Sequence, residues 1–180
     1  MHPLVSVAAR SFYPDLAGAH VLVAGDALAV RRARQVAGAL GMIARRLPRL
    51  DLAAYHAAAA LVANGAAALA AAGERLLVRG GTPPRLVPRM LGPLLRSVAD
   101  NVAKLGLPAA LTGPVRRGDA EAVRRHLESL KRSAPETLPL YVAGALYQLE
   151  MARRLGDTTR ARLAAVHGAL KERRFRAIHR

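Results

Sequence analysis

Cysteine is absent from this chain of 180 residues, and aromatic residues make up only 3% of it. Without cysteine the chain can form no disulfide, no thiolate nucleophile and no cysteine-based metal site. Because there is no tryptophan and there are only two phenylalanines, the interior has to be built from Ala, Leu and Val. Small side chains of this kind suit helices that approach one another closely, so the composition disfavours an all-β sandwich.

Acidic residues are scarce as well: 12 stand against 28 basic residues, which gives a formal net charge of +16. Only Lys104, Lys131 and Lys171 are lysines, and the other basic residues are arginines. A charge of this size attracts phosphates. The basic residues form no single block, however, and no aromatics interleave with them, unlike a dedicated nucleic-acid surface. We therefore favour arginines spread over solvated helix faces, in a protein from a GC-rich bacterial genome.

Targeting signals and long apolar runs are missing too. The start, Met1 to Leu4, lacks a basic segment followed by a sustained apolar one, so no secretory signal is predicted. The most apolar stretch, residues 57–73, is rich in alanine, interrupted by Asn64 and shorter than the ~20 residues that a bilayer requires. We interpret it as a buried helix of a cytoplasmic protein without membrane contact.

A strand, helix, strand order is predicted for the first fifty residues. Short runs rich in Val and Leu, bounded by Pro and Gly, predict strands at residues 2–7, 20–24 and 42–47. Asp26 is placed to cap a helix whose apolar residues keep helical spacing to Leu40, and Gly41 follows its end. This order is half of a doubly wound α/β unit. We therefore assign residues 1–50 to a small, partial Rossmann βαβ remnant.

From Asp51 onward the apolar spacing is helical, and no further strand signal follows. Helices are predicted over residues 51–79, 84–105, 119–131, 135–155 and from 157 to the end of the chain. Asp51, Asp119 and Asp157 are the expected N-caps of the first, third and last of these helices. Pro93 is expected to kink the second helix or to split it in two. The predicted fold class is therefore mainly α, with residues 51–180 forming an all-helical domain.

The motifs of several enzyme classes are missing from the sequence. There is no G-x-G-x-x-G, no lysine in a Walker loop, no H-E-x-x-H and no G-x-S-x-G. The six histidines are too dispersed to predict a metal site. Because the glycine-rich turn is absent, no helix N-terminus is available on which the diphosphate of a dinucleotide would rest. We expect no dinucleotide binding by this chain alone.

One segment that carries chemistry is Tyr55 to Asn64, in which an imidazole and an amide lie on an otherwise apolar helix. His56 and Asn64 are eight residues apart, which places them about 80° apart around the helix and two turns along it. His56 could donate a proton to a developing alkoxide, and Asn64 could orient a substrate. Both residues could equally be polar groups that serve only helix packing.

A second such segment is the stretch from Ala110 to Asp119, whose glycines and prolines predict a tight loop. The loop would expose the Thr112 hydroxyl and the Arg117 guanidinium, which are donors suited to an anionic oxygen. Asp119 has a simpler explanation as the N-cap of the following helix.

These two segments together resemble the Rossmann-like oxidoreductase family whose C-terminal half is the domain of unknown function 2520. Asn101 and His126-Leu127 fit the same order, and the match in spacing extends over roughly residues 51–155. The stretch from Thr112 to Asp119 is its most specific part.

The opening of the chain shares this resemblance. His2-Pro3-Leu4 is similar to a late Rossmann strand of the family, and Gly25-Asp26 is similar to the turn before its last Rossmann helix. Family members carry the glycine-rich turn and several more strands ahead of that strand. We therefore expect either that the true start lies upstream or that the gene has been reduced to its helical part. In both cases hydride transfer by these 180 residues alone is not expected.

The resemblance implies an all-helical domain similar to those of pyrroline-5-carboxylate reductase and 6-phosphogluconate dehydrogenase, preceded by a dinucleotide-binding domain for NAD or NADP. Such helical domains usually dimerise, so a homodimer is expected, with residues 51–180 as its dimerisation and substrate domain. The small-molecule substrate, which is unknown, would bind in the cleft between the cofactor and the first long helix. Catalytic roles are implied for His56 and Asn64, and substrate-binding roles for His2, Thr112, Arg117 and Asp119.

The alternative from a different class is a basic helical nucleic-acid-binding protein. It would use the basic residues of the last helices: Arg153, Arg154, Arg160, Arg162, Lys171, Arg173, Arg174, Arg176 and Arg180. Its binding would fall steeply with salt, because each phosphate contact releases counterions.

Overall fold

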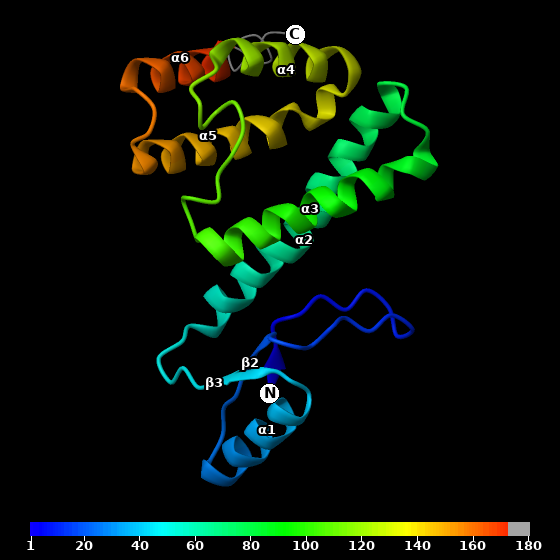
Figure 1. Cartoon of the computed structure of the whole chain (residues 1–180), viewed down its shortest axis with the longest axis vertical. Helices are drawn as coiled ribbons and strands as arrows, with labels where there is room; N and C mark the ends of the chain where they lie inside the picture. Colours follow the sequence, from blue (N-terminus) through cyan, green and yellow to red (C-terminus); the bar gives the residue numbers. More distant parts are fainter. Residues whose placement is uncertain (173–180) are drawn as a thin grey trace. The chain divides into compact units, whose positions relative to one another are not determined.

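The structure is a computed structural model that describes residues 1–172. The described part of the chain is mainly helical, with 64% of those residues in helices and 6% in strands or isolated β-bridges (Figure 1). Contacts within the chain divide it into an N-terminal unit, Met1–Ala67, and a C-terminal unit from Ala68 onward. The boundary lies inside helix α2 (Leu52–Arg79), whereas the sequence placed a domain boundary ahead of that helix.

A three-stranded sheet and one helix form the core of the N-terminal unit. The strands are β1 (His2–Pro3), β2 (His20–Leu22) and β3 (Ile43–Arg45), in the order β1-β2-β3. β2 is antiparallel to β1 and parallel to β3. All three predicted strands are present, but each is shorter than its apolar run.

Helix α1 (Ala27–Ala39) connects the two parallel strands β2 and β3. The predicted cap is confirmed: an Asp26 carboxylate oxygen accepts the backbone N–H of Ala29 at 2.7 Å. The helix and the sheet share a small buried core, in which the helix contributes one side at helical spacing. This core consists of Val21, Val23, Val30, Ala33, Ala37 and Met42.

Helix α2 is 28 residues long, and it begins where the sequence predicted, because Asp51 accepts the backbone N–H groups of Ala53 and Ala54. None of its residues is buried. The prediction that residues 57–73 form a buried helix is therefore wrong. Apolar composition predicted that this helix needs a partner, but its residues are at most partly buried within residues 1–172.

Within residues 1–172, α2 is the one helix long and apolar enough to cross a bilayer. Its most apolar window of 18 residues has a mean hydropathy of 1.4 and is 0% buried. The sequence analysis argued against a membrane-spanning helix because the apolar stretch was too short. That reason is wrong, since the whole of α2 is long enough. Core helices of soluble proteins share this length and composition, so these properties do not assign α2 to a membrane. The cytoplasmic location stays a prediction.

The second long helix, α3 (Val87–Leu105), follows a short 3-10 turn, η1 (Pro84–Leu86). The helix continues through Pro93 and is not split. Proline removes only the bond that the carbonyl of Arg89 would accept. Because Arg89 is exposed, water can satisfy that carbonyl.

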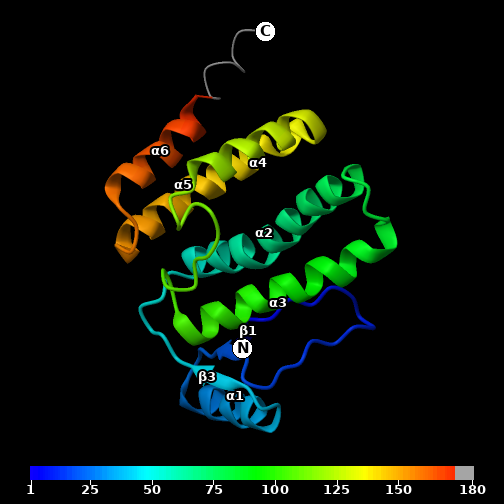
Figure 2. The ribbon, with the colours of Figure 1, turned by 45° about the horizontal axis from the view of Figure 1, so that its top comes forward.

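The last three described helices pack around the larger core of the C-terminal unit. They are α4 (Ala120–Ser133), α5 (Leu138–Leu155) and α6 (Arg160–Lys171), and the short 3-10 turn η2 (Pro135–Thr137) joins the first two. Helix α6 lies against both α4 and α5 (Figure 2). The fully buried side chains of this core include Val123, Leu127, Leu149, Val166 and Leu170.

The start of α6 differs from the prediction. Thr159, and not Asp157, is its N-cap, because the Thr159 hydroxyl accepts the backbone N–H of Arg162. Asp157 instead forms an ion pair with Arg116. Predictions that concern residues 173–180 lie outside the described residues: the continuation of the last helix to the chain end, and a basic surface that includes Arg173, Arg174, Arg176 and Arg180.

Candidate functional site

A cluster of three rings lies where strand β1 meets the start of helix α2. The ring centroids of His2 and His56 are 4.5 Å apart, and those of His2 and Tyr55 are 5.5 Å apart. Both pairs meet edge to face, which is a favoured arrangement for rings. The structure thus brings together two of the predicted site residues, His2 and His56, from positions 54 residues apart in the chain.

The His2 imidazole carries an unsatisfied polar atom. Its Nδ1 is buried and has no hydrogen-bond partner among residues 1–172. Buried polar atoms without a partner are uncommon, and each of them calls for a physical explanation. His56 beside it is exposed. The ring cluster therefore holds one accessible imidazole and one unused nitrogen.

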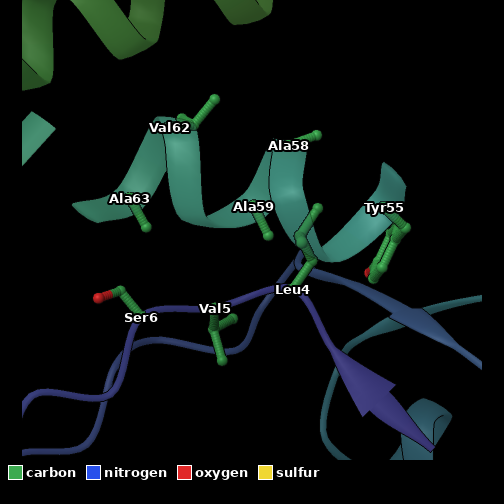
Figure 3. Close-up of a pocket in the computed structure, with 8 residues that line it drawn as sticks. All are labelled: Leu4, Val5, Ser6, Tyr55, Ala58, Ala59, Val62 and Ala63. Carbon is green, nitrogen blue, oxygen red and sulfur yellow. The ribbon is translucent and has the colours of Figure 1, made fainter. Parts of the chain in front are cut away.

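Next to these rings lies an apolar pocket of about 410 Å³. It lies between Leu4–Ser6, which follow β1, and one face of α2, from which Ala59 and Ala63 point toward that segment (Figure 3). Tyr55 belongs both to the pocket wall and to the ring cluster. The hydroxyls of Tyr55 and Ser6 are the polar side-chain groups of this lining. A mostly apolar pocket with a few polar groups is typical of small-molecule sites.

Asn64 does not join this arrangement. It follows the lining residue Ala63 but is exposed and is not part of the pocket wall. Eight residues of helix separate it from His56, which is about 12 Å along the axis. The two side chains are therefore too far apart along the helix to contact the same atom of a small substrate.

The other predicted residues lie in the C-terminal unit, on the loop ahead of α4. Thr112 and Arg117 are exposed, as the sequence predicted. Asp119 is the N-cap of α4, since its carboxylate accepts the backbone N–H of Ala122 at 2.9 Å. One of its carboxylate oxygens is therefore already bonded within the protein.

Arg116, which the sequence did not single out, fixes this loop. Its guanidinium lies 2.8 Å from the carboxylate of Asp157 and donates to the carbonyl of Leu111 at 2.6 Å. The hydroxyl of Thr158 in turn donates to the carbonyl of Arg116 at 2.8 Å. Because Asp157 is 41 residues away in the chain, no local pattern could have distinguished Arg116 from Arg117.

Gly118 fixes the loop from the other side. Its φ of +64° lies in the left-handed region, where glycine is favoured. A Cβ at this position would lie 2.6 Å from the Cβ of Arg162 and 2.9 Å from a methyl carbon of Thr158. The backbone of the loop therefore lies directly against α6, and Thr112 and Arg117 are presented from a rigid support.

The N-terminus of α1 does not fit the diphosphate of a dinucleotide. Such a group needs free backbone N–H groups at a helix start that follows a glycine-rich turn. Here the turn holds one glycine, Gly25, and the carboxylate of Asp26 already occupies the helix start by accepting from Ala29. A second anion would meet the negative charge of Asp26 at this position.

The fold is thus a mainly helical chain with a small mixed sheet, and its candidate residues are divided between two units. The family described as Domain of unknown function (DUF2520) matches residues 19–148. The chain belongs to this family. No curated protein and no solved structure gives a match to the chain.

Proposed function

We propose that this chain is the substrate-binding and dimerisation part of an NAD(P)-dependent oxidoreductase-like protein. Its helical region would then have the fold of the C-terminal domains of 6-phosphogluconate dehydrogenase and its relatives, and the βαβ unit would be a Rossmann remnant. The observation that supports this most is the meeting of His2, Tyr55 and His56 at the edge of an apolar pocket. Family membership is consistent with the proposal, but the family itself has no assigned activity.

In this proposal a small carbonyl compound binds with its apolar part against α2. His56, which is exposed, donates a proton to the oxygen that becomes an alkoxide, and the His2 ring packs edge to face against His56 and holds it in place. Thr112 and Arg117 belong to the other unit, and for them we propose only that their donors bind an anionic oxygen. Asn64 and Asp119 would have orienting roles only.

A nicotinamide cofactor, NAD or NADP, is the hydride donor that the resemblance implies. It would have to be held by residues outside this sequence, because the start of α1 is capped by Asp26 and the glycine-rich turn is absent. We therefore derive no cofactor contact from this chain and expect it to be inactive by itself.

The second part of the proposal is a homodimer formed through α3. Met90, Leu94, Val98, Val102 and Leu105 follow one another at spacings of four, four, four and three residues, which places them along one side of the helix. Their exposed fractions run from 41% to 61%. A continuous apolar stripe of this length is uncommon on a monomer and is typical of an interface. A second copy offers an identical stripe and buries both.

The substrate site is tested by NMR of the histidine rings during titration with a panel of small keto acids, aldehydes and cyclic imines. A true ligand should shift the ring signals of His2 and His56. The ring signals of His126 and His167, which lie in the C-terminal unit outside the pocket, are the internal control. Binding that moves the control rings as much as the two site rings would contradict the proposed pocket.

The competing function, nucleic-acid binding, is supported by one observation on the last helices. Arg153, Arg160 and His167 line a hollow of about 740 Å³ between α5 and α6. The pKa of His167 is lowered, first by partial burial and then by the charges of Lys171 and Arg153. This role predicts retention of DNA or RNA at low salt that disappears steeply as salt increases. Absence of any retention at low salt would exclude it.

A further inference from the structure

Positive charge in the N-terminal unit is not balanced by ion pairs. Residues 1–67 contain seven arginines and three aspartates, with no lysine or glutamate. Each aspartate is used by the backbone: Asp15 accepts the N–H of Ala17, Asp26 that of Ala29, and Asp51 those of Ala53 and Ala54. No salt bridge found in the described residues involves an arginine of this unit. Arg45 donates from its Nε to the His20 ring at 3.2 Å, and none of the seven guanidinium groups is paired with a carboxylate.

Three of these arginines gather at one place. Arg31 and Arg34, one turn apart on α1, and Arg46, which directly follows β3, line a pocket of about 540 Å³. The rest of the wall is Ala27, Val30 and the amide of Gln35, and no acidic residue lines it. Val30 is buried and belongs to the core, so the floor of the pocket is fixed by the packing of α1 against the sheet.

This arrangement differs from arginines scattered over a solvated face. Arg31 and Arg34 share one side of a helix, whereas Arg46 comes from a separate element that the sheet holds in place. Like charges that converge on one hollow repel one another, and a bound anion removes that repulsion. Guanidinium groups present paired donors whose geometry matches the oxygens of a phosphate. Arg32, on the same helix, is exposed and does not line the pocket.

We propose that Arg31, Arg34 and Arg46 form a binding site for the phosphate or diphosphate group of a small phosphorylated molecule. The site shares no residue with the ring cluster, and its wall includes Ala27, the first residue of α1, but not the capping residue Asp26. Gln35 adds an amide that can donate to a phosphate oxygen or accept from a hydroxyl beside it. This inference does not depend on the proposed oxidoreductase role.

The test is isothermal titration of the full chain with inorganic pyrophosphate at fixed ionic strength. The wild-type protein should bind one equivalent, and Arg31→Gln, Arg34→Gln and Arg46→Gln should each weaken binding about tenfold. Arg32→Gln is the matched control, because it removes the same charge from the same helix but not from the pocket. It should weaken binding less than twofold. All four arginines are exposed, so thermal melting should show that each variant remains folded.

Two results would overturn the site. One is no saturable binding of pyrophosphate by the wild-type chain. The other is an equal loss in all four variants, which would mean general attraction to the positive surface.

A single-stranded oligonucleotide, titrated in parallel, distinguishes the source of the phosphate. We expect the oligonucleotide to bind more weakly per site than pyrophosphate. If it binds much more tightly, and if Arg32→Gln and Arg46→Gln reduce that binding equally, the arginines belong to a nucleic-acid surface instead.

Discussion

Gly118→Ala should destabilise the C-terminal unit more than any other glycine-to-alanine change in its loops. At φ +64° a side chain costs about 1–2 kcal/mol, because the left-handed conformation crowds the Cβ. The new Cβ would also lie 2.6 Å from the Cβ of Arg162, on a buried helix contact that cannot open freely. Overpacking of this kind costs about 1–3 kcal/mol. The expected total is therefore about 2–5 kcal/mol.

Gly156→Ala is the matched control for this prediction. Gly156 has a nearly identical φ of +72°, but a Cβ there would meet nothing within 4 Å. It should cost only the conformational part, about 1–2 kcal/mol. Urea denaturation followed by circular dichroism measures both variants, and equal slopes of the unfolding curves make the comparison valid. If the two variants lose the same stability within about 0.5 kcal/mol, the close packing of the loop against α6 is refuted.

Three further predictions concern the C-terminal unit. Leu127→Ala, in the buried core, should lower the free energy of unfolding by about 2–5 kcal/mol, whereas Tyr147→Ala, at a side chain that is 74% exposed, should change it by less than about 0.5 kcal/mol in urea denaturation. Asp119→Ala should cost about 1 kcal/mol through loss of the cap, and Asp119→Asn should retain most of that stability; an equal loss in both would contradict the capping role. Burial raises the pKa of Tyr141, so its contribution to stability is complete below the ordinary tyrosine pKa and is lost as the pH rises through the higher folded value. Tyr141→Phe should therefore flatten the fall in melting temperature above about pH 10, and an unchanged alkaline slope would argue against this assignment.

Local signals predicted much of the fold. Asp26, Asp51 and Asp119 were expected to be N-caps and are N-caps, because capping depends on a side chain and the next few backbone N–H groups. Asp157 was expected to be one too, but a guanidinium 41 residues away takes its carboxylate. A local sequence pattern cannot predict that a distant side chain will compete with the helix backbone for a carboxylate.

Burial was the property that sequence reasoning predicted least well. The alanine-rich part of α2 was expected to be a core helix, yet no residue of α2 is buried. Apolar composition indicates only that a surface is better covered than exposed, and it does not say by what. The exposed apolar stripe along α3 likewise needs a covering surface, and we propose that a second copy of the chain provides it.

The candidate site was predictable only in part. His56 stood out because an imidazole lay on an apolar helix, but its contact with His2 depends on a strand and a helix meeting across the N-terminal unit. The apolar pocket next to these rings could not be derived from spacing. Neither could the role of Arg116, which was masked by the more conspicuous Arg117 beside it.

The most direct test of the proposed role is the mass of the chain in solution, measured by light scattering across micromolar concentrations. We predict twice 19.1 kDa, with Leu94→Arg shifting the protein to the monomer mass because it places a charge in the middle of the apolar stripe. Tyr147→Arg, at a site on α5 that is 74% exposed against 57% for Leu94, should leave the dimer intact. A stable, cooperatively folded wild-type protein of 19.1 kDa, or recovery only from membranes, would contradict this account.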